Sequence, residues 1–320
     1  MTGGRHSSML LPDDCSWMSP QRWTVGMGYR YFHSHRHFVG SEEQNNRKQQ
    51  GSEVNNKVTI WDIAATYQVN NRWSVSLDVP VLSMDRWSQR TPTQVSQADG
   101  IGDINVMSRM WLFTPSAEES NQNISIGIGM KFPTGKPDTQ STVTLANGTQ
   151  RTSNNDQSIQ LGDGGYGLIL EAQAYKGFRH AMLYASGSYL INPKVNNGVA
   201  TGRRPSEAIM SVADSYLYRG GVMFPIPKFH SLAMSMGIRG EGVPVRDLIG
   251  KSTNFRRPGT AVALDPGLIY SRGRDQWSFN VPVAMYRNRQ RSIPDIIDQR
   301  AGGDAAFADQ SIVIGYQRKF

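Results

Sequence analysis

The stretch from Asn123 to Phe132, NISIGIGMKF, decides the fold because apolar residues alternate with polar or small ones along its whole length. In an extended chain its isoleucines, Met130 and Phe132 share one face, while Ser125, the glycines and Lys131 share the other. A period of two with one apolar face is the signature of a β-strand. The pattern recurs in Ser231–Glu241 and Gln276–Arg287, so the sequence predicts an all-β protein.

Followed along the chain, the alternation predicts about twelve strands. Most have close to the roughly 9–11 residues that a tilted strand needs to cross a bilayer. The expected strands are Arg22–His33, Val58–Val69, Trp73–Val81, Asp103–Phe113, Ile124–Phe132, Gly165–Lys176, Ala181–Ile191, Asp214–Phe224, Ser231–Glu241, Ala261–Ser271, Trp277–Arg287 and Asp309–Phe320.

The connections between these strands alternate between short and long. The short ones are Asn70–Arg72, Thr114–Asn123, Gly177–His180, Pro225–His230 and Ser271–Gln276. The long, polar ones are Phe38–Lys57, Ser83–Gly102, Pro133–Gly164, Asn192–Ala213, Gly242–Thr260 and Asn288–Ala308. This pattern is typical of an antiparallel transmembrane up-and-down β-barrel with short periplasmic turns and long extracellular loops. We expect Pro133–Gly164, the longest connection, to fold inward and constrict the barrel.

The face opposite the apolar one carries basic and acidic residues in equal numbers. A soluble barrel would bury these groups at a high desolvation cost, whereas a membrane barrel places them in a polar lumen. The predicted lumen-lining residues are Arg30, Asp62, Asp78, Asp103, Arg109, Lys131, Glu171, Arg219, Arg239, Glu241, Asp265 and Lys319. They either set the charge selectivity of a path or pair with one another and stiffen the barrel.

Composition excludes several other classes of protein. Of 320 residues, 38% are hydrophobic and 19% are charged, and no run of about 18 apolar residues predicts a transmembrane helix. The net charge of +8 is scattered and accompanies no nucleic-acid-binding motif, so no nucleic acid partner is expected. The single cysteine, Cys15, cannot form an internal disulfide. His33, His35 and His37 would share one face of a strand, but on an exposed rim, and we expect neither a metal nor a cofactor.

The two ends of the chain give separate expectations. Met1–Asp14 lacks the apolar core of a signal peptide, and we expect residues 1–21 to be a flexible tail before a single barrel domain, 22–320. The chain ends on Phe320. An aromatic residue at the end of the last strand is what the barrel-assembly machinery recognises in outer-membrane barrels. We therefore expect outer-membrane lipid, lipopolysaccharide, this machinery and a small-molecule solute as partners, in a Gram-negative-type outer membrane.

Four short motifs resemble a known family. Arg30–Ser34 follows the first strand, Asp99–Asp103 (DGIGD) opens another, Lys131–Lys136 (KFPTGK) ends the next, and Gly162–Gly167 (GDGGYG) opens the sixth. They are similar to the outer-membrane transporter-like family labelled "MetA-pathway of phenol degradation". The resemblance implies a barrel associated with the passage of small compounds, aromatic or apolar ones among them.

The sequence offers no catalytic motif that outweighs this interpretation. Lys131–Lys136 does not fit a phosphate-binding loop, and the chain has no GxSxG element. His180 and His230 fall in predicted short turns. We therefore expect a channel or passive transporter for small solutes, and not an enzyme. The alternatives are a structural or adhesive barrel that presents surface loops and an outer-membrane lipid-modifying enzyme.

Overall fold

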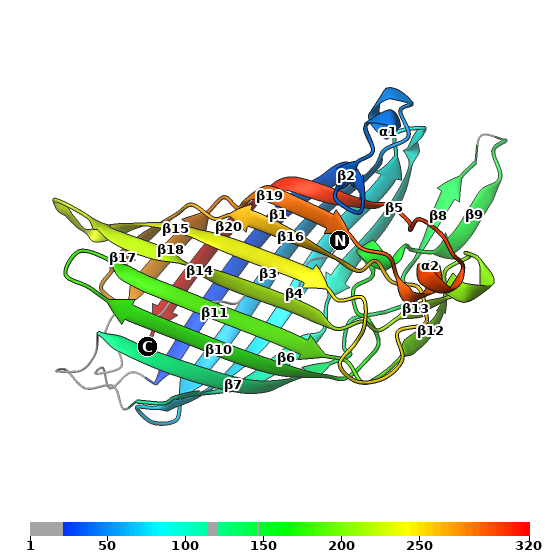
Figure 1. The fold of residues 1–320 in the computed structure, drawn as a ribbon. Coiled ribbons are helices and arrows are strands. Elements are labelled where there is room, and N and C mark those ends of the chain that lie inside the picture. The colour runs from blue at the N-terminus through cyan, green and yellow to red at the C-terminus, as the bar shows by residue number, and fades with distance from the viewer. Residues whose placement is uncertain (1–21, 114–120, 146) are drawn as a thin grey trace.

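Strands β1 (Trp23–Val39) and β20 (Ala305–Lys319) pair antiparallel from Thr24–Lys319 to Phe38–Ala305, which closes the sheet into a barrel (Figure 1). The computed structural model describes residues 22–113, 121–145 and 147–320. The expected N-terminal tail and Cys15 lie outside them. The next barrel strands are β3 (Val54–Gln68), β4 (Trp73–Ser88), β6 (Ile104–Trp111), β7 (Gln122–Phe132), β10 (Gly167–Gly177), β11 (Met182–Ile191), β14 (Ser215–Ile226) and β15 (Phe229–Val243).

The last two strands before β20 are each broken in two. The first consists of β16 (Gly259–Leu264) and β17 (Gly267–Arg272), and the second of β18 (Asp275–Asn280) and β19 (Val283–Arg289). Pro266 and Pro282 lie in the breaks, where proline supplies no N–H to a ladder. With each broken strand counted once, the barrel has the predicted 12 strands. One consequence is a weak seam, because β19 pairs with β20 only at Val283–Gln310.

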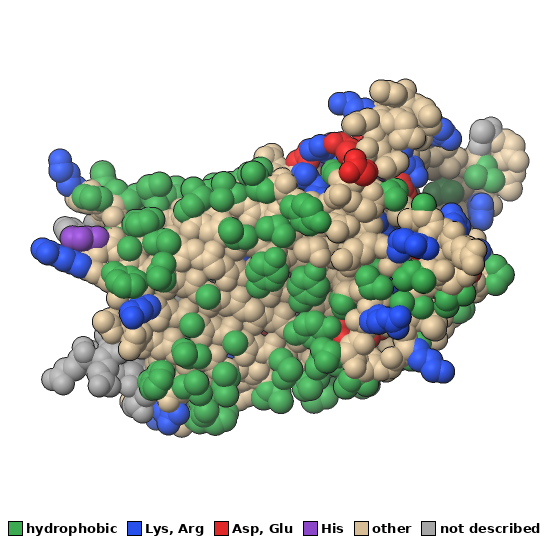
Figure 2. All heavy atoms as spheres, in the orientation of Figure 1, with side chains coloured by type: hydrophobic (Ala, Val, Ile, Leu, Met, Phe, Trp, Pro, Cys, Tyr) green, Lys and Arg blue, Asp and Glu red, His purple; other side chains and the backbone are tan. Residues whose placement is uncertain are grey.

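The outer wall carries the predicted apolar face. On β7, Ile126, Ile128 and Met130 are about half exposed, and green apolar side chains spread over the visible wall in Figure 2. Aromatic pairs mark the short-turn end, as in Trp277–Tyr316 with ring centroids 4.3 Å apart. Such a band with aromatic girdles is the lipid-facing surface of an outer-membrane barrel.

The strands extend further than the alternation predicted at the long-connection end. β1 runs on to Val39 and β4 to Ser88, and β5 (Thr91–Ile101) pairs back onto β4. Much of the predicted loops Phe38–Lys57 and Ser83–Gly102 is therefore strand, and that prediction was wrong. Beyond the apolar band the outward side chains of β4 are polar, as at Ser83 and Asp85, while Leu82 and Met84 face inward, so the outward apolar stripe ends although the backbone pairing continues.

The long connections also hold small elements that are not part of the barrel wall (Figure 1). Two are five-residue helices that the sequence did not predict, and the second begins with a capping box between Ser292 and Asp295. Among the described residues, no helix is long and apolar enough to cross a membrane. These elements are β2 (Glu42–Glu43), α1 (Asn45–Gln49), β8 (Gln140–Thr144), β9 (Gln150–Asn154), η2 (Gln157–Ile159), β12 (Asn196–Ala200), η3 (Pro205–Glu207), β13 (Ile209–Ser211) and α2 (Ile293–Ile297).

A charge on the lipid-facing side of β7 tests this arrangement. We expect Ile128→Arg to lower the free energy of unfolding in lipid vesicles by about 2–4 kcal/mol, because the side chain faces the centre of the apolar band. Gln122→Arg, at the end of the same strand, is the matched control and should cost about 0–1 kcal/mol. Equal costs at the two positions, measured by denaturant unfolding, would contradict a membrane-spanning β7.

Candidate functional site

Charged side chains from distant strands meet inside the barrel. Nη2 of Arg30 on β1 donates to Glu241 Oε1 on β15 at 2.6 Å. Strands β1 and β15 are not neighbours in the sheet, so this ion pair crosses the interior. Nη2 of Arg239, also on β15, lies 3.4 Å from the other oxygen of Glu241. One carboxylate therefore lies between two guanidinium groups.

Two more of the predicted interior charges pair across a glycine on the strand between them. Arg109 on β6 and Glu171 on β10 both flank Gly127 of the strand between them, and Nε of Arg109 lies 2.6 Å from Glu171. The absence of a side chain at Gly127 leaves room, since a Cβ there would lie 3.2 Å from that of Glu171. Arg109 Nη1 also donates to Ser76 Oγ at 2.7 Å, so the group spans four strands.

A third group lies at the break between β16 and β17. Arg219 Nη2 is 2.7 Å from Asp265 Oδ2, and Asn280 donates to the other oxygen of Asp265 at 3.1 Å. Asp265 is 1% exposed, so its charge depends on these partners. The broken strand thus turns a carboxylate inward and holds it there.

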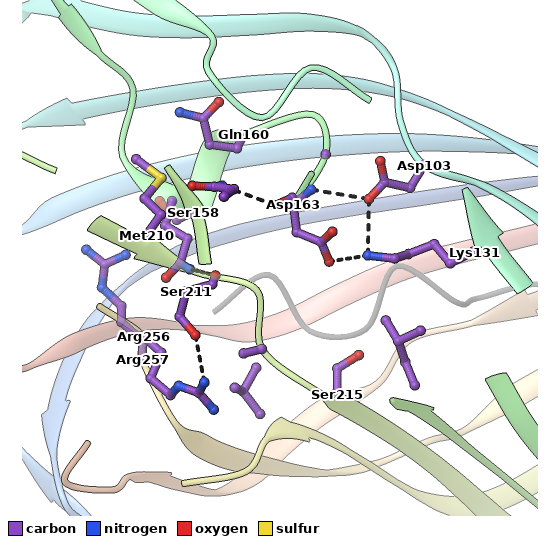
Figure 3. A pocket seen from close by; sticks show the side chains of 16 residues that line it. Asp103, Lys131, Ser158, Gln160, Asp163, Met210, Ser211, Ser215, Arg256 and Arg257 are labelled. Atoms are coloured by element: carbon purple, nitrogen blue, oxygen red, sulfur yellow. Dashed lines mark hydrogen bonds and ion pairs between the residues drawn. The ribbon is translucent and has the colours of Figure 1, made fainter. Parts of the chain in front are cut away.

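Three of the four family-like motifs converge at a polar junction formed by Asp103, Lys131, Gly135, Gly162 and Asp163. Lys131 Nζ pairs with both Asp103 and Asp163, and Asp103 accepts from the Gly135 and Asp163 amides at 3.0 and 3.2 Å (Figure 3). A Cβ at Gly162 would collide with the Gly135 carbonyl oxygen. The glycines are needed here because two backbone segments touch.

The remaining predicted interior residues lie elsewhere on the same face. Asp62 and Asp78 are both 6% exposed, and Lys319 is half-buried at the end of the last strand. The structure therefore joins most of the predicted charges into groups, and Asp78 adjoins the Arg109 group because the Ser76 hydroxyl lies 3.4 Å from its carboxylate. That all of them line a path for solute remains a proposal.

The sequence did not predict an apolar cluster inside the mouth of the barrel. Phe32, Val58, Ile60, Leu82 and Met84 point inward from β1, β3 and β4 and pack against one another. The signal was present in β3, where Val58 and Ile60 face inward while Trp61 and Ile63 face outward. Apolar residues on both faces of a strand indicate burial on both sides. The sequence prediction assumed one apolar and one polar face for each strand and therefore did not include this pattern.

Part of the longest connection covers this cluster. The hairpin of β8 and β9 projects away from the barrel (Figure 1), but Ile159 and Leu161 beyond it are 0% and 6% exposed and belong to the apolar cluster. The expectation that Pro133–Gly164 folds inward is therefore correct only for its last third. We call residues 155–163 the inner segment.

Asp156 fixes the inner segment in place through the arginines that bind its carboxylate. Its carboxylate accepts from Nη1 and Nη2 of Arg257 at 2.6 and 2.7 Å, and Arg86 and Arg203 lie 3.5 Å away. The guanidinium groups of Arg203 and Arg257 also lie over the Phe255 ring, at 4.2 and 4.9 Å from its centroid. Three cations thus converge on one carboxylate that starts helix η2.

A cavity of about 110 Å³ lies between the inner segment and the barrel wall (Figure 3). Lys131, Arg256 and Arg257 contribute charge to its lining, whereas Leu190 and Met210 contribute apolar surface. Arg256 is fully buried, and its two terminal nitrogens are bound by Asp247 and Ser211. The interior is therefore partly filled and partly open below the mouth.

The three histidines of β1 do not share a face, contrary to the prediction. His33 and His35 stack with ring centroids 4.9 Å apart, while His37 is buried and contacts Asp304 and the Val54 amide. Register shifts against β20 between Phe32 and Arg36 break the alternation. Within the described residues, no cluster of three metal-ligating side chains occurs.

The Asp156 clamp gives a pH prediction. Burial alone would raise the pKa of Asp156, but Arg257 and Arg86 outweigh burial and hold it well below its ordinary value. A lowered pKa contributes stability that is complete above the ordinary carboxyl pKa and is lost only as the pH falls through the lowered value. Hydrogen exchange at the Ile159 amide, which donates to the Asp156 carbonyl, should therefore stay equally slow from pH 7 to about pH 4 after correction for intrinsic rates.

Asp156→Asn should accelerate this exchange already at pH 7, because the amide keeps the shape but not the charge. Asp138→Asn, in the same connection, is the control and should leave the exchange unchanged. Loss of protection in the wild-type protein near pH 5 would contradict the clamp.

Comparison with known proteins supports the fold. No protein-family model and no curated protein matches the sequence. The crystal structure of an outer membrane channel from Pseudomonas putida F1 matches 97% of this chain and 100% of its own, with a TM-score of 0.64 and 12% identity. The β domain of the Bordetella autotransporter BrkA and the Ralstonia pickettii toluene transporter TbuX match 92% and 95% of this chain and 100% and 91% of their own, at 13% and 11% identity, but their TM-scores, 0.48 and 0.45, carry no argument.

The barrel that the family resemblance implies is confirmed, and so is the predicted fold class. The structure is an outer-membrane β-barrel, because the barrel is closed, carries an apolar outer band and shares its fold with the Pseudomonas channel.

Proposed function

We propose that the protein is an outer-membrane channel or passive transporter for small solutes, small aromatic or apolar compounds among them. The observation that carries this proposal is the interior, where charged groups and an apolar cluster bound open cavities instead of a packed core. Twelve strands leave more room than the side-chain-filled eight-stranded barrels. The shared fold with an outer membrane channel supports the proposal.

In this proposal the interior charges line the path and set its selectivity. Arg30, Arg219 and Arg239 lie at mid-barrel, and the junction around Lys131 lies closer to the mouth. Solute would pass between apolar and charged walls, which suits compounds with an apolar body and a polar group. The inner segment would narrow the path.

The other readings have less support. A lipid-modifying enzyme needs a nucleophile positioned beside a base. The charged groups described above are instead ion pairs and carboxylates that accept hydrogen bonds from backbone amides. A surface adhesin needs exposed loops, which this chain has, but it gives no reason for cavities lined by charged side chains inside the barrel. We further propose that residues 22–320 act as one barrel domain and that the assembly machinery reads Phe320, which is 54% exposed beside Trp23.

Solute influx into proteoliposomes tests the proposed function. Vesicles containing folded protein should swell in small solutes that lipid alone excludes, such as arabinose, and should exclude large ones such as raffinose, because the interior is narrow. Deleting 140–154, the β8–β9 hairpin outside the barrel, should leave the cutoff unchanged. Swelling no faster than in protein-free vesicles would contradict a channel.

The interior arginines give a prediction about ions. Arg239→Gln and Arg219→Gln should each raise the cation-to-anion permeability ratio by about twofold or more, because each removes one positive charge beside the path. Reversal potentials in a salt gradient measure this ratio. Arg318→Gln, on the exposed outer side of β20, should leave it unchanged. Unaltered selectivity with lowered stability would show that the charges only stiffen the barrel.

A further inference from the structure

Two buried arginines at mid-barrel have N–H groups that no described protein atom accepts. These are Nε and Nη1 of Arg30 and Nε of Arg239. The two residues are only 4% and 5% exposed. A buried donor without an acceptor is costly, and a charged donor is costlier still. Both side chains line one cavity of about 60 Å³ inside the barrel.

Arg30 and Arg239 both form ion pairs with one carboxylate, that of Glu241. The neighbouring carboxylate Asp265 is held by Arg219. Asp309 also lines the cavity but is bound by Arg36 and Arg287, at 2.8 and 2.5 Å. Asp62 faces an adjoining cavity of about 70 Å³ that Arg239 shares. The cavity beside Arg30 therefore offers guanidinium N–H groups in excess of carboxylates, which favours an anion.

One part of the cavity wall is apolar. The Phe32 ring lies 5.1 Å from the Arg30 guanidinium and gives the cavity an aromatic wall. Its other apolar lining residues are Ala261, Ala263, Pro282, Ala284, Phe307 and Ala308, and the uncharged polar residues Gln310 and Ser311 also line it. The small alanine side chains leave width for a flat group on the side that faces β16 and β19. The lining thus matches a molecule with an anionic head and a flat apolar body.

We propose that this cavity binds a small aromatic carboxylate. Its carboxylate accepts from the free N–H groups of Arg30 and Arg239, and its ring lies between Phe32 and the alanines of β16 and β19. The proposal rests on the proposed function, because the bound acid is a solute in passage, and it narrows that function to aromatic acids. Planar guanidinium groups suit a carboxylate because both present paired donors or acceptors.

Equilibrium binding of radiolabelled benzoate to the folded full-length protein in lipid nanodiscs tests the proposal without requiring transport. Benzoate should bind saturably, and Arg239→Gln should weaken it about tenfold or more. Ala263→Leu should fill the cavity and weaken benzoate by a similar factor while leaving all charges in place. Arg318→Gln is the control for loss of one positive charge and should bind as the wild type does. Heat-modifiable gel mobility shows that each variant is folded.

Three results would overturn the proposal. Benzamide, the neutral analogue, could bind as tightly as benzoate; chloride at equal concentration could displace benzoate, which would indicate a site for simple anions; or Ala263→Leu could leave benzoate affinity unchanged. If Arg239→Gln does not fold, benzoate binding to Ala263→Leu and benzamide binding to the wild-type protein still test the proposal. Benzoate binding without solute influx would keep this site and reject the channel, and influx without binding would do the reverse.

Discussion

Charge pairing across the barrel interior is the constraint on which the rest of the structure depends. A closed barrel with lipid outside turns its polar face inward, where a buried charge is expensive unless it is paired. The chain meets this cost by letting carboxylates and guanidinium groups from non-neighbouring strands reach each other, as Arg30 and Glu241 do at 2.6 Å. Glycine at Gly127 and the break at Pro266 make room for two further groups. These groups hold the wall at a fixed width and leave the spaces between them open.

The mouth follows a different principle. There the inward faces of β1, β3 and β4 are apolar, and the inner segment covers them with Ile159 and Leu161. Two polar anchors fix that segment: Asp156 among its arginines at one end and the junction with Asp103 and Lys131 at the other. A solute that entered would meet an apolar surface first and a charged one below it. This order suits molecules with an apolar body and a polar group better than sugars or inorganic ions.

Much of the barrel could be predicted from sequence, since a lipid-facing strand needs apolar residues at alternate positions for its full crossing. The Asn123–Phe132 pattern illustrates this, because its apolar residues lie half exposed on the outer wall of β7. The interior groups could be predicted only as a set of inward charges. Which charged residues pair depends on the stagger of the strands and on the places where a strand is interrupted. The alternation along one strand shows which side chains face inward, but it does not show which of them meet between β1 and β15. The strand extensions beyond Val81 and the bulges that separate His37 from His33 were missed for a related reason: they lie where the membrane no longer imposes a pattern.

Single-channel recording in a planar bilayer tests the central claim most directly, namely that the paired charges bound a continuous water-filled path. Purified, folded protein should give small, steady, ohmic steps, because the cavities are narrow but lined by charged side chains. Absence of conductance from barrels whose folding has been verified would contradict the claim. It would show that the ion-pair groups and the inner segment together seal the interior.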